Sequence, residues 1–530
     1  MNEPAQASSS KYILVIDLGS SGIKTVLVSD SGEVVANAYE PVETQYLENE
    51  GAEQDPHHWW NGTLKAAKET VQKSNISPDQ IVGIACDSQW AVVVPVNEQA
   101  EPVMNAVHWF DQRGAPYNKK VISGFPSIQG YGALKLLKWL RLTGLAPVHS
   151  GVDSLGHILF IKNERPDVYA RTHKFLEPMD YITARLTGRI TGTQQSVMAM
   201  MVVSNRKWGE VAYNNTLLKL AGLDKDKLPD LLPNDAVIGP VLPSVARELG
   251  VNPDTPVTAG TNDTQAIAIG AGLGNIYEAA INIGTSLNMI THVPFKKTDI
   301  FHMITSFPSS FKDRYLMLCE QGLGGRCLEH FLKYIVCPDD DFKFGSMPED
   351  AYDRLSGMAD EVPAGSGGVI FLPWLNGSLA PSESATARGG FMNMSLSTTR
   401  SHLTRAVMEG VAFNSRRAFG PAQKFIKAKI GHLRLAGGGA ISDVWTQIYA
   451  DIVQVPIHQV DDTMNTTSRG AGLTGLVMLG HLKLEDVPSL VKVKKIFEPN
   501  PDNFEVYDKM FAQFEVLFNK NQSVFKALNS

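Results

Sequence analysis

The chain has 530 residues, of which 43% are hydrophobic and 19% are charged, and its net charge is −7. This length exceeds one ordinary hydrophobic core and suits two large domains. The composition is typical of a soluble globular protein and excludes a disordered or fibrous one. Because the 48 Lys and Arg residues do not outnumber the 55 Asp and Glu residues, the charge argues against nucleic acid as a partner.

Cysteines and termini indicate the compartment. No zinc-site spacing or disulfide framework is found among the four cysteines: Cys86, Cys319, Cys327 and Cys337. Sparse cysteines fit a reducing compartment. The first ten residues lack the cationic and apolar stretches of a secretory signal, and no apolar run approaches a membrane span. We therefore expect a cytoplasmic enzyme that contacts no membrane.

Two similar segments lie half a chain apart. Residues 12–17 read Tyr-Ile-Leu-Val-Ile-Asp and run into Leu-Gly-Ser-Ser-Gly, followed by a β-branched run at 23–30. This pattern predicts a β-hairpin. Residues 280–286 read Ala-Ile-Asn-Ile-Gly-Thr-Ser and repeat it 265 residues later, counted from Asp17 to Asn282. The repeat favours two related domains facing each other across a cleft, and a chance match is the alternative.

The chemistry of both turns suits a nucleotide. Backbone N–H groups in Gly/Ser/Thr turns can point at phosphate oxygens, and hydroxyls add donors. The candidate phosphate-binding residues are Ser20, Ser21, Gly284 and Thr285. Asp17 occurs only in the first copy and is the candidate metal ligand, since Mg²⁺ is bound by few carboxylates beside water and phosphate oxygens. The alternative for each turn is an ordinary tight hairpin.

A candidate base follows a short β-like run at residues 255–259. Asp263 lies between this run and a small-residue helix pattern at 265–274. In α/β folds, ligand sites lie at such strand-to-helix junctions. The carboxylate could accept a proton from a substrate hydroxyl during phosphoryl transfer. Helix capping by Asn262 or Asp263 is the alternative.

Residues 433–440 form another strand that runs into three glycines, and an amphipathic helix follows at 442–453. Glycines allow a flat adenine or ribose to lie against the backbone. Gly437, Gly438 and Ser442 are therefore candidate ATP contacts. A plain strand–helix turn capped by Ser442 is the alternative.

An acid and a base two residues apart, Asp111 and Arg113, follow two aromatic residues. Both could point into one polar pocket and hold sugar hydroxyls by charge-assisted hydrogen bonds. The alternative is a surface ion pair.

Two other motifs are predicted to be structural. A G-x-G-x-x-G at 470–475 follows a polar stretch instead of a strand, which favours helix packing over a dinucleotide loop. Residues 134–141 predict a short basic amphipathic helix, with a solvated face on a packed helix favoured over a membrane surface. Neither a P-loop nor a G-x-S-x-G elbow occurs, which weighs against P-loop ATPases and α/β-hydrolases.

In this order the segments resemble the FGGY family of carbohydrate kinases, and xylulokinase-like members most closely, over about residues 12–480. Residues 51–60 are similar to the family's W-x-E-Q-D-P-x-x-W-W stretch, with Gly51 in place of the first Trp. Residues 180–188 are similar to its D-Y-x-x-x-x-L-T-G segment. Residues 387–413 are similar to its long C-terminal signature, and 437–451 to its adenosine-binding segment.

The resemblance implies an α/β fold with two actin-like (ribonuclease-H-like) domains flanking an active-site cleft that binds ATP, Mg²⁺ and a sugar. It implies that Asp263 is the catalytic base and that Asp17 lies near Mg²⁺. It further implies phosphate contacts at the two turns, adenosine contacts at the three glycines and sugar contacts at Asp111 and Arg113.

The sugar pocket departs from the family pattern. Xylulokinases usually show Gln-Met-His-Gly where this chain has Gln89, Trp90, Ala91 and Val92. Losing one buried polar partner can shift specificity by orders of magnitude. A ketopentose such as xylulose is the first expectation, with Gln89, Trp90, Asp111, Arg113 and Asp263 binding it. Glycerol, a tetritol, ribulose and a heptulose are the alternatives.

The expected organisation is an N-terminal domain at 12–252 on the sugar and Mg²⁺ side, and a C-terminal domain at 253–498 on the ATP side. Residues 499–530 are expected to form a helix packed on the body. The segment 125–154 is longer than the family's usual connection.

A catalytically weak sugar sensor on the same fold is the main alternative to a kinase, and an actin-like assembly protein is a third interpretation. A homodimer is left open.

Overall fold

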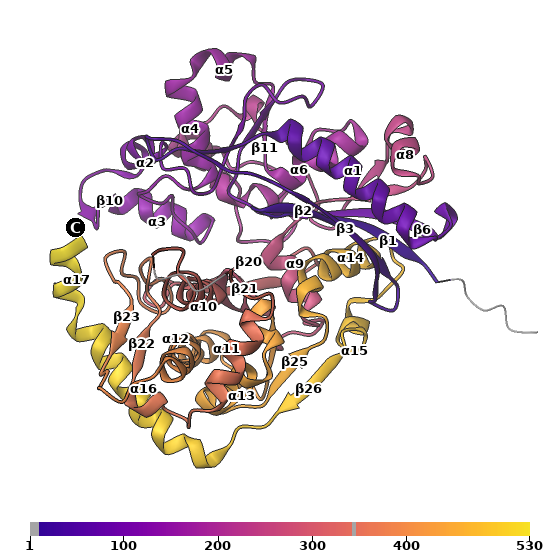
Figure 1. Ribbon diagram of the computed structural model, residues 1–530. Coiled ribbons are helices and arrows are strands. Elements are labelled where there is room, and N and C mark those ends of the chain that lie inside the picture. Colours follow the sequence, from indigo (N-terminus) through magenta and orange to yellow (C-terminus); the bar gives the residue numbers. More distant parts are fainter. Residues whose placement is uncertain (1–9, 342–345, 530) are drawn as a thin grey trace, which may run out of the picture.

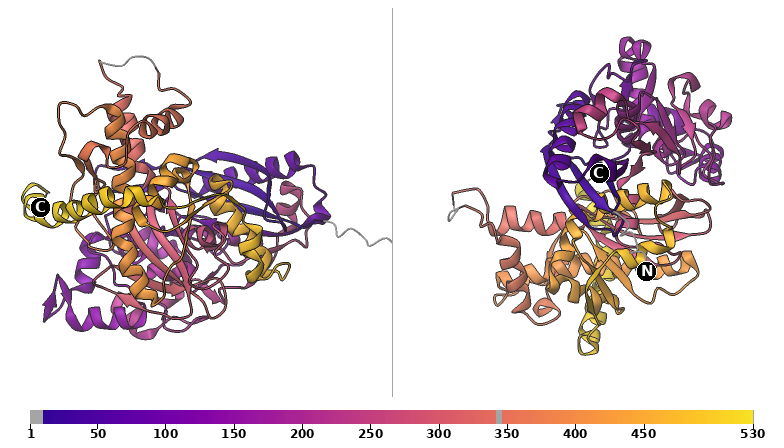
Figure 2. Two further views of the ribbon diagram at one scale, coloured as in Figure 1. Left: turned by 90° about the horizontal axis from the view of Figure 1, so that it is seen from below. Right: turned by 90° about the vertical axis from the view of Figure 1, so that its right-hand side faces the viewer.

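The computed structural model describes residues 10–341 and 346–529, which fold into two α/β halves (Figure 1). In Figure 1 the N-terminal half lies above in indigo and magenta, and the C-terminal half lies below in orange and yellow. The right-hand view of Figure 2 shows the same two lobes from the side. Each half is built around one large β-sheet, which confirms the predicted two-domain α/β fold.

The first sheet has seven strands and contains the first predicted hairpin. β1 (Tyr12–Leu18) pairs antiparallel with β2 (Gly22–Ser29), and β2 pairs antiparallel with β3 (Val34–Pro41). On its other side β1 pairs parallel with β6 (Ile81–Ser88). The sheet is completed by β14 (Val237–Pro240), β15 (Pro256–Thr258) and β16 (Thr261–Asn262). Because β1 is covered on both faces, its sequence is almost continuously apolar.

The second sheet has eight strands and repeats this order. β17 (Ala279–Ile283) and β18 (Ser286–Val293) form the second predicted hairpin. β18 pairs antiparallel with β21 (Tyr315–Leu323), and β17 pairs parallel with β24 (Leu433–Ala436). The sheet extends through β19 (Thr298–Asp299), β20 (Ile304–Pro308), β25 (Ile457–Val460) and β26 (Val493–Phe497). The order β3-β2-β1-β6-β15 thus corresponds to β21-β18-β17-β24-β25, which supports duplication over a chance match.

Helices α9 (Asp263–Gly270) and α14 (Thr466–Met478) pack together although they come from opposite halves of the chain. Small residues allow the contact, because a Cβ on Gly470 would lie 1.8 Å from the carbonyl oxygen of Ala266. Gly475 likewise lies against β1. The G-x-G-x-x-G motif is therefore a helix-packing motif, as its sequence context predicts.

Longer helices cover the sheets. α1 (Pro56–Ser74) packs on β1, β2 and β3. α12 (Arg400–Ile426) contacts β18 and β21, and α13 (Asp443–Val453) contacts β25 and β26. The remaining helices are α2 (Ala115–Ile122), α4 (Ser154–Glu164), α5 (Pro166–Arg171), α6 (Pro178–Thr187), α7 (Asn215–Ala221), α8 (Pro243–Leu249), α10 (Gly325–Phe331), α11 (Ala351–Asp360) and α15 (Val487–Leu490). Short strands complete the halves: β4 (Gln45–Tyr46), β5 (Ala52–Gln54), β7 (Val94–Val96), β8 (Ala106–Val107), β11 (Lys174–Leu176), β12 (Thr191–Thr193), β13 (Asp230–Leu232), β22 (Ile370–Leu372) and β23 (Gly390–Met392).

The C-terminal helices α16 (Phe504–Lys520) and α17 (Gln522–Asn529) run along the outside of the second half (Figure 1). Tyr507, Phe514 and Phe518 of α16 are buried in the core of that half. The expected domain limits stay predictions, and β15 and β16 join the first sheet although they lie beyond residue 252.

The segment 125–154 forms the hairpin β9 (Ser127–Ile128) and β10 (Tyr131–Gly132), followed by α3 (Ala133–Leu142). Trp139 anchors α3 in the core, but Leu134 and Leu137 are 68% and 62% exposed. The packed face is therefore narrower than the sequence pattern predicts, because Trp139 is the one residue of this helix that is buried. Among the described residues, no helix combines the length and apolar character needed to cross a membrane.

Candidate active site

The first predicted phosphate turn joins β1 to β2. The Gly19 N–H closes it by donating to the carbonyl oxygen of Gly22 (2.9 Å). Ser21 is exposed. The Ser20 hydroxyl instead donates to Oε1 of Gln89 (2.8 Å) and accepts from the indole N–H of Trp109 (3.0 Å). Ser20 is therefore hydrogen-bonded to Gln89, which is a predicted sugar contact. Ser21 is the hydroxyl of this turn that is exposed to a ligand.

Gln89 is held by its own hydrogen bonds. Its amide nitrogen donates to Oε1 of Gln54 (2.9 Å), and the Gln54 amide donates to Oγ1 of Thr44 (2.7 Å) and to the carbonyl oxygen of Ser20 (2.8 Å). These hydrogen bonds connect the first turn to β5 and hold the Gln89 side chain in place. A sugar contact by Gln89 remains a prediction.

Asp111 and Arg113 lie in the loop between β8 and α2. The buried Asp111 carboxylate accepts from the N–H groups of Ala52 and Arg113 (both 2.9 Å) and from Arg113 Nε (2.8 Å). Arg113 also binds Glu53 (2.7 Å), so the pair is internal and not a surface ion pair. A Cβ on Gly51 would lie 2.9 Å from Arg113 Nε. The glycine at this position therefore makes room for the guanidinium.

Trp90 is partly buried and packs against two hydrophobic clusters, one within the first half and one that contains residues of both halves. Ala91, the next residue, has a left-handed backbone with φ of 58°. The Val92 N–H donates to the buried carboxylate of Glu177 (3.2 Å), which fixes this turn. Burial raises the pKa of Glu177 to about 8. Trp90 thus lies where these two clusters meet, and its sugar contact stays a prediction.

Asp263 is the first residue of α9. The cap of this helix is Asn262, whose side chain accepts from the Gln265 N–H (3.0 Å), so Asp263 is not needed for capping. The Asp263 carboxylate accepts from the Thr264 hydroxyl (3.2 Å) and remains partly exposed. Its surroundings raise its pKa to about 6, chiefly by desolvation. Such a carboxylate is ionised at neutral pH and basic enough to accept a proton.

Three carboxylates converge beside the first turn. Asp17 on β1 lies opposite Asp87 on β6, and Asp87 lies opposite Thr261, two residues before Asp263. Residues opposite each other on parallel strands point to one face of a sheet. Asp263 begins α9 directly after β16, and its charge acts on Asp87 while that of Asp17 acts on Asp263. Desolvation, followed by the charges of Asp17 and Asp263, raises the pKa of Asp87 well above its usual value. Burial also raises the pKa of Asp17, against a hydrogen bond from Ser468.

The second predicted phosphate turn joins β17 to β18. The Gly284 N–H donates to the carbonyl oxygen of Ser286 (3.0 Å), and Thr285 is exposed. The start of α10 lies against it, because the Gly325 N–H donates to the Gly284 carbonyl oxygen (2.7 Å). A Cβ on Gly324 would lie 2.8 Å from the Ser286 carbonyl oxygen. The turn is thus closely covered on one side and open on the other.

The predicted adenosine contacts lie beside this turn. Gly437 has φ of 86°, and a Cβ there would lie 2.6 Å from Asn282 Oδ1, so the position requires glycine. Gly438 is exposed, with nothing within 4 Å of a Cβ. The Ser442 hydroxyl caps α13 by accepting from the Trp445 N–H (3.1 Å), and it also accepts from the Ser356 hydroxyl (2.9 Å). The local capping role of Ser442 is therefore present, and its ATP contact remains a prediction.

Two acidic residues of the site were not predicted. Asp87 lies near the end of the apolar strand β6, as Asp17 lies near the end of β1. A carboxylate at the end of an apolar strand is the signal by which the sequence could have identified Asp87. Glu320 lies on β21, where burial raises its pKa to about 8 against a hydrogen bond from the Gly322 backbone. The nearby charge of Asp263 adds to this rise. No sequence pattern pairs Glu320 with Asp263, because the two lobes bring them together.

The residues around Asp17 fit a hydrated divalent cation. Oδ2 of Asp17 accepts from the Ser468 hydroxyl (2.7 Å). Within residues 10–341 and 346–529, neither carboxylate oxygen of the buried Asp87 has a hydrogen-bond partner. In the described part of the chain, no cluster of three or more His, Cys, Asp or Glu residues is spaced to hold an ion. A cation here would take its other ligands from water and phosphate, as Mg²⁺ commonly does.

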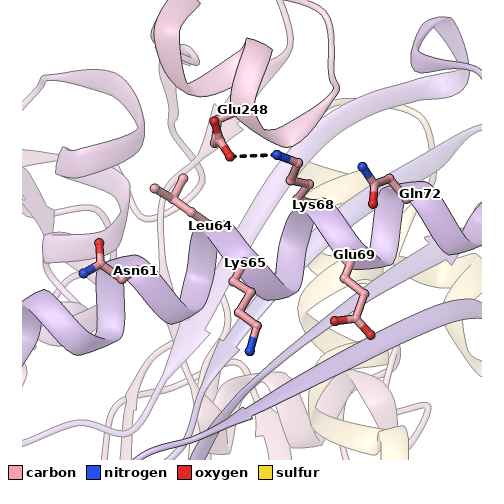
Figure 3. Close-up of a pocket in the computed structure, with 7 residues that line it drawn as sticks. All are labelled: Asn61, Leu64, Lys65, Lys68, Glu69, Gln72 and Glu248. Carbon is pink, nitrogen blue, oxygen red and sulfur yellow. Dashed lines mark hydrogen bonds and ion pairs between the residues drawn. The ribbon is translucent and has the colours of Figure 1, made fainter.

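A surface hollow between α1 and α8 is separate from these residues (Figure 3). The ion pair between Lys68 and Glu248 (3.0 Å) crosses it. Its lining contains none of the predicted site residues, and exposed ion pairs of this kind contribute little to binding or stability. We assign no function to this hollow.

Comparison with known proteins covers nearly the whole chain. Residues 12–270 match the N-terminal domain, and residues 279–479 the C-terminal domain, of the FGGY family of carbohydrate kinases. The chain is 26% identical to xylulose kinase from Bacillus subtilis (strain 168), over 98% of this chain and 99% of that protein. It is 26% identical to gluconokinase from the same strain, over 90% of each chain.

Solved structures show the same fold. Xylulose kinase from Lactobacillus acidophilus superposes with a TM-score of 0.83 at 24% identity, covering 98% of this chain and 100% of that one. The two family matches together span most of the sequence, and the first of them ends with α9, the helix that begins at the candidate base. The chain therefore belongs to the FGGY family of carbohydrate kinases.

Proposed function

We propose that this kinase transfers the γ-phosphoryl group of ATP to a hydroxyl of a small ketose, with a ketopentose such as xylulose as the first candidate. The observation that carries the proposal is Asp263, a partly exposed carboxylate with a pKa of about 6 at the junction of the two lobes. The similarity to proteins named xylulose kinase supports the choice of sugar.

The residues would divide the work as follows. Asp263 would accept the proton of the attacking hydroxyl, since phosphoryl transfer asks the protein mainly for positioning and charge stabilisation. Ser21 and the turn at Gly284 and Thr285 would bind phosphate oxygens, with adenosine beside Gly437 and Gly438. Bound Mg²⁺, held at Asp17, would neutralise phosphate charge. Closure of the lobes would exclude water and limit wasteful hydrolysis of ATP.

The sugar would lie between Trp90 and the Asp111–Arg113 loop. Arg113 is held in place by Asp111 and Glu53, whose two carboxylates balance its charge, so it would contribute hydrogen-bond donors for sugar hydroxyls. Two relatives are named gluconokinase. Gluconate is therefore the second candidate substrate.

A coupled assay of ADP release with ATP and Mg²⁺ tests the proposal. The panel contains xylulose, ribulose, a heptulose, glycerol, a tetritol and gluconate. Turnover of xylulose above the others supports the first candidate, and turnover of gluconate supports the second. Sugar binding by calorimetry without ADP release from any member would instead support a catalytically weak sensor.

Three further features belong to this proposal. We expect that the metal is Mg²⁺ and that the protein is cytoplasmic. A homodimer is the oligomeric state that we would test. Sedimentation of the purified chain at several concentrations distinguishes monomer from dimer. Light scattering with ATP tests for filaments, whose absence removes the assembly-protein reading.

A further inference from the structure

Asp87 is a buried carboxylate without a visible structural task. Its side chain is 0% exposed, and neither carboxylate oxygen has a hydrogen-bond partner among the residues that the structure describes. Burying a charged group without a partner is costly, so such a group is expected to have a ligand or to be neutral. Its position on β6, opposite Asp17 on β1, places it beside the expected metal ligand.

The nearby cation Lys24 offsets this charge only in part. Lys24 lies opposite Asp17 on β2, but its amino group donates to the carbonyl oxygen of Met464 (2.8 Å). Ser468 donates to Oδ2 of Asp17 and leaves Oδ1 of that carboxylate without a side-chain donor. Strands in a sheet lie about 4.8 Å apart. One cation can therefore lie within reach of carboxylates from both strands.

We propose that Asp87 is a second carboxylate ligand of the divalent cation, beside Asp17, and that the enzyme binds this cation before the nucleotide arrives. The inference rests on the Mg²⁺ site of the proposed function and adds a ligand to it. One carboxylate gives a cation little affinity in the absence of phosphate oxygens, and a second adjacent carboxylate adds a ligand and a negative charge that raise this affinity. Mg²⁺ is commonly coordinated by one or two carboxylates, with water molecules in several of the remaining positions.

The test measures metal binding without nucleotide or sugar. Mn²⁺ is titrated into the metal-free protein and followed by electron paramagnetic resonance of the free ion. The variants are Asp87→Asn, Asp17→Asn and the matched control Asp180→Asn. Asp180 is a buried carboxyl group that accepts from the Ser196 hydroxyl (2.7 Å), so Asp180→Asn makes the same chemical change at a buried site away from β1.

We expect one Mn²⁺ per chain in the unmodified protein. Its affinity should fall at least tenfold in Asp87→Asn and in Asp17→Asn, and should stay within twofold in Asp180→Asn. An Asp87→Asn protein that binds Mn²⁺ as tightly as the unmodified chain overturns the inference and leaves the Asp17 site intact. Unchanged binding in Asp17→Asn instead overturns the metal site of the proposed function.

Thermal melting separates a loss of ligand from a loss of fold. Because Asp87→Asn removes an unpaired buried carboxylate, the metal-free variant should melt at the same temperature as the metal-free parent or above it. Saturating Mn²⁺ should raise the melting temperature of the parent and not of the variant. If Asp87→Asn unfolds, Asp87→Ser replaces it, and an equal Mn²⁺ stabilisation of that variant and the parent overturns the inference.

Discussion

At the scale of single residues, the chemistry depends on where each carboxylate lies in the sheet. Asp17 and Asp87 are neighbours across β1 and β6, whereas Asp263 begins α9. These three positions differ in burial and hydrogen bonding, and so their pKa values differ. Asp263 has a pKa of about 6 and is the group suited to accept a proton at neutral pH.

Replacing Asp263 by Asn should lower kcat by about 10²–10⁴-fold, because the side chain keeps its shape and loses its basicity. Nucleotide affinity, measured by calorimetry, should stay within about threefold of the parent. Asp180→Asn is the matched control, since that buried carboxylate is bound to Ser196. Near-normal turnover in Asp263→Asn would show that another group accepts the proton.

The activity should depend on pH with the sign set by Asp263. The base works when deprotonated, so kcat/KM should fall as the pH drops below about 6, approaching tenfold per pH unit. Measurement of kcat/KM from pH 5 to 8, at saturating metal, checks the slope. A profile that is flat down to pH 5 contradicts the assignment of Asp263 as the titrating base.

At the scale of elements, two glycine-rich segments do different jobs. Glycines 437–439 follow β24 and form the turn beside β17, whereas the glycines of α14 let this helix approach α9 and the first sheet. Both segments are rich in glycine in the sequence. Only the first has an open side where a nucleotide could lie, because Gly438 is exposed.

Gly437→Ala should weaken ATP binding, because the new Cβ would meet Asn282 and Ile283 in a backbone with φ of 86°. The cost of such backbone strain is about 1–3 kcal/mol. Gly420→Ala in α12 is the control, since nothing lies within 4 Å of its Cβ and the residue is not a predicted nucleotide contact. The KM for ATP and the melting temperature are measured for both. Equal effects in the two variants would show that the turn is not rigid.

Gly470→Ala should destabilise the protein by about 1–3 kcal/mol or more, because its Cβ would overlap the carbonyl oxygen of Ala266. Gly357→Ala in α11 is the control, with open space around its Cβ, and should stabilise that helix by about 0.5–1 kcal/mol. Urea unfolding measures both. A Gly470→Ala protein as stable as its parent would contradict the close packing of α9 on α14.

At the scale of the whole molecule, contacts between distant segments hold the second lobe together. The buried Glu409 of α12 accepts hydrogen bonds from Arg405 (2.8 Å), from the Tyr507 hydroxyl (2.9 Å) and from the Gly365 N–H (3.0 Å). Tyr507 belongs to α16, so the network ties the C-terminal helix to the core. The helix α16 thus contributes a hydrogen-bonding side chain, as well as apolar side chains, to the core of this lobe.

Tyr507→Phe should lower the free energy of unfolding by about 1–3 kcal/mol, since Arg405 loses the acceptor at 2.9 Å and Glu409 loses a donor. Tyr352→Phe, at a position 49% exposed, should change it by less than about 0.5 kcal/mol. Chemical denaturation of both variants checks the difference. Equal stabilities would show that the hydroxyl contributes nothing to the attachment of α16.

The sequence alone determined much of this architecture for local reasons. Apolar runs ending in Gly/Ser/Thr turns predicted both hairpins, and a β-like run before a small-residue pattern located Asp263 at a helix start. These features depend on neighbouring residues and on backbone preferences, which a single sequence displays. The long signature at 387–413 added the family and, with it, the two-domain fold.

Only the tertiary structure decided which polar groups are satisfied. Ser20 is turned toward Gln89 and Trp109, Arg113 is fixed by Asp111 and Glu53, and Asp87 is left without a partner. Each of these outcomes joins residues that are distant in the chain, through strand register or the approach of two lobes. Local patterns carry no information on such pairings, because hydrogen bonding and desolvation are set by the groups that folding brings together.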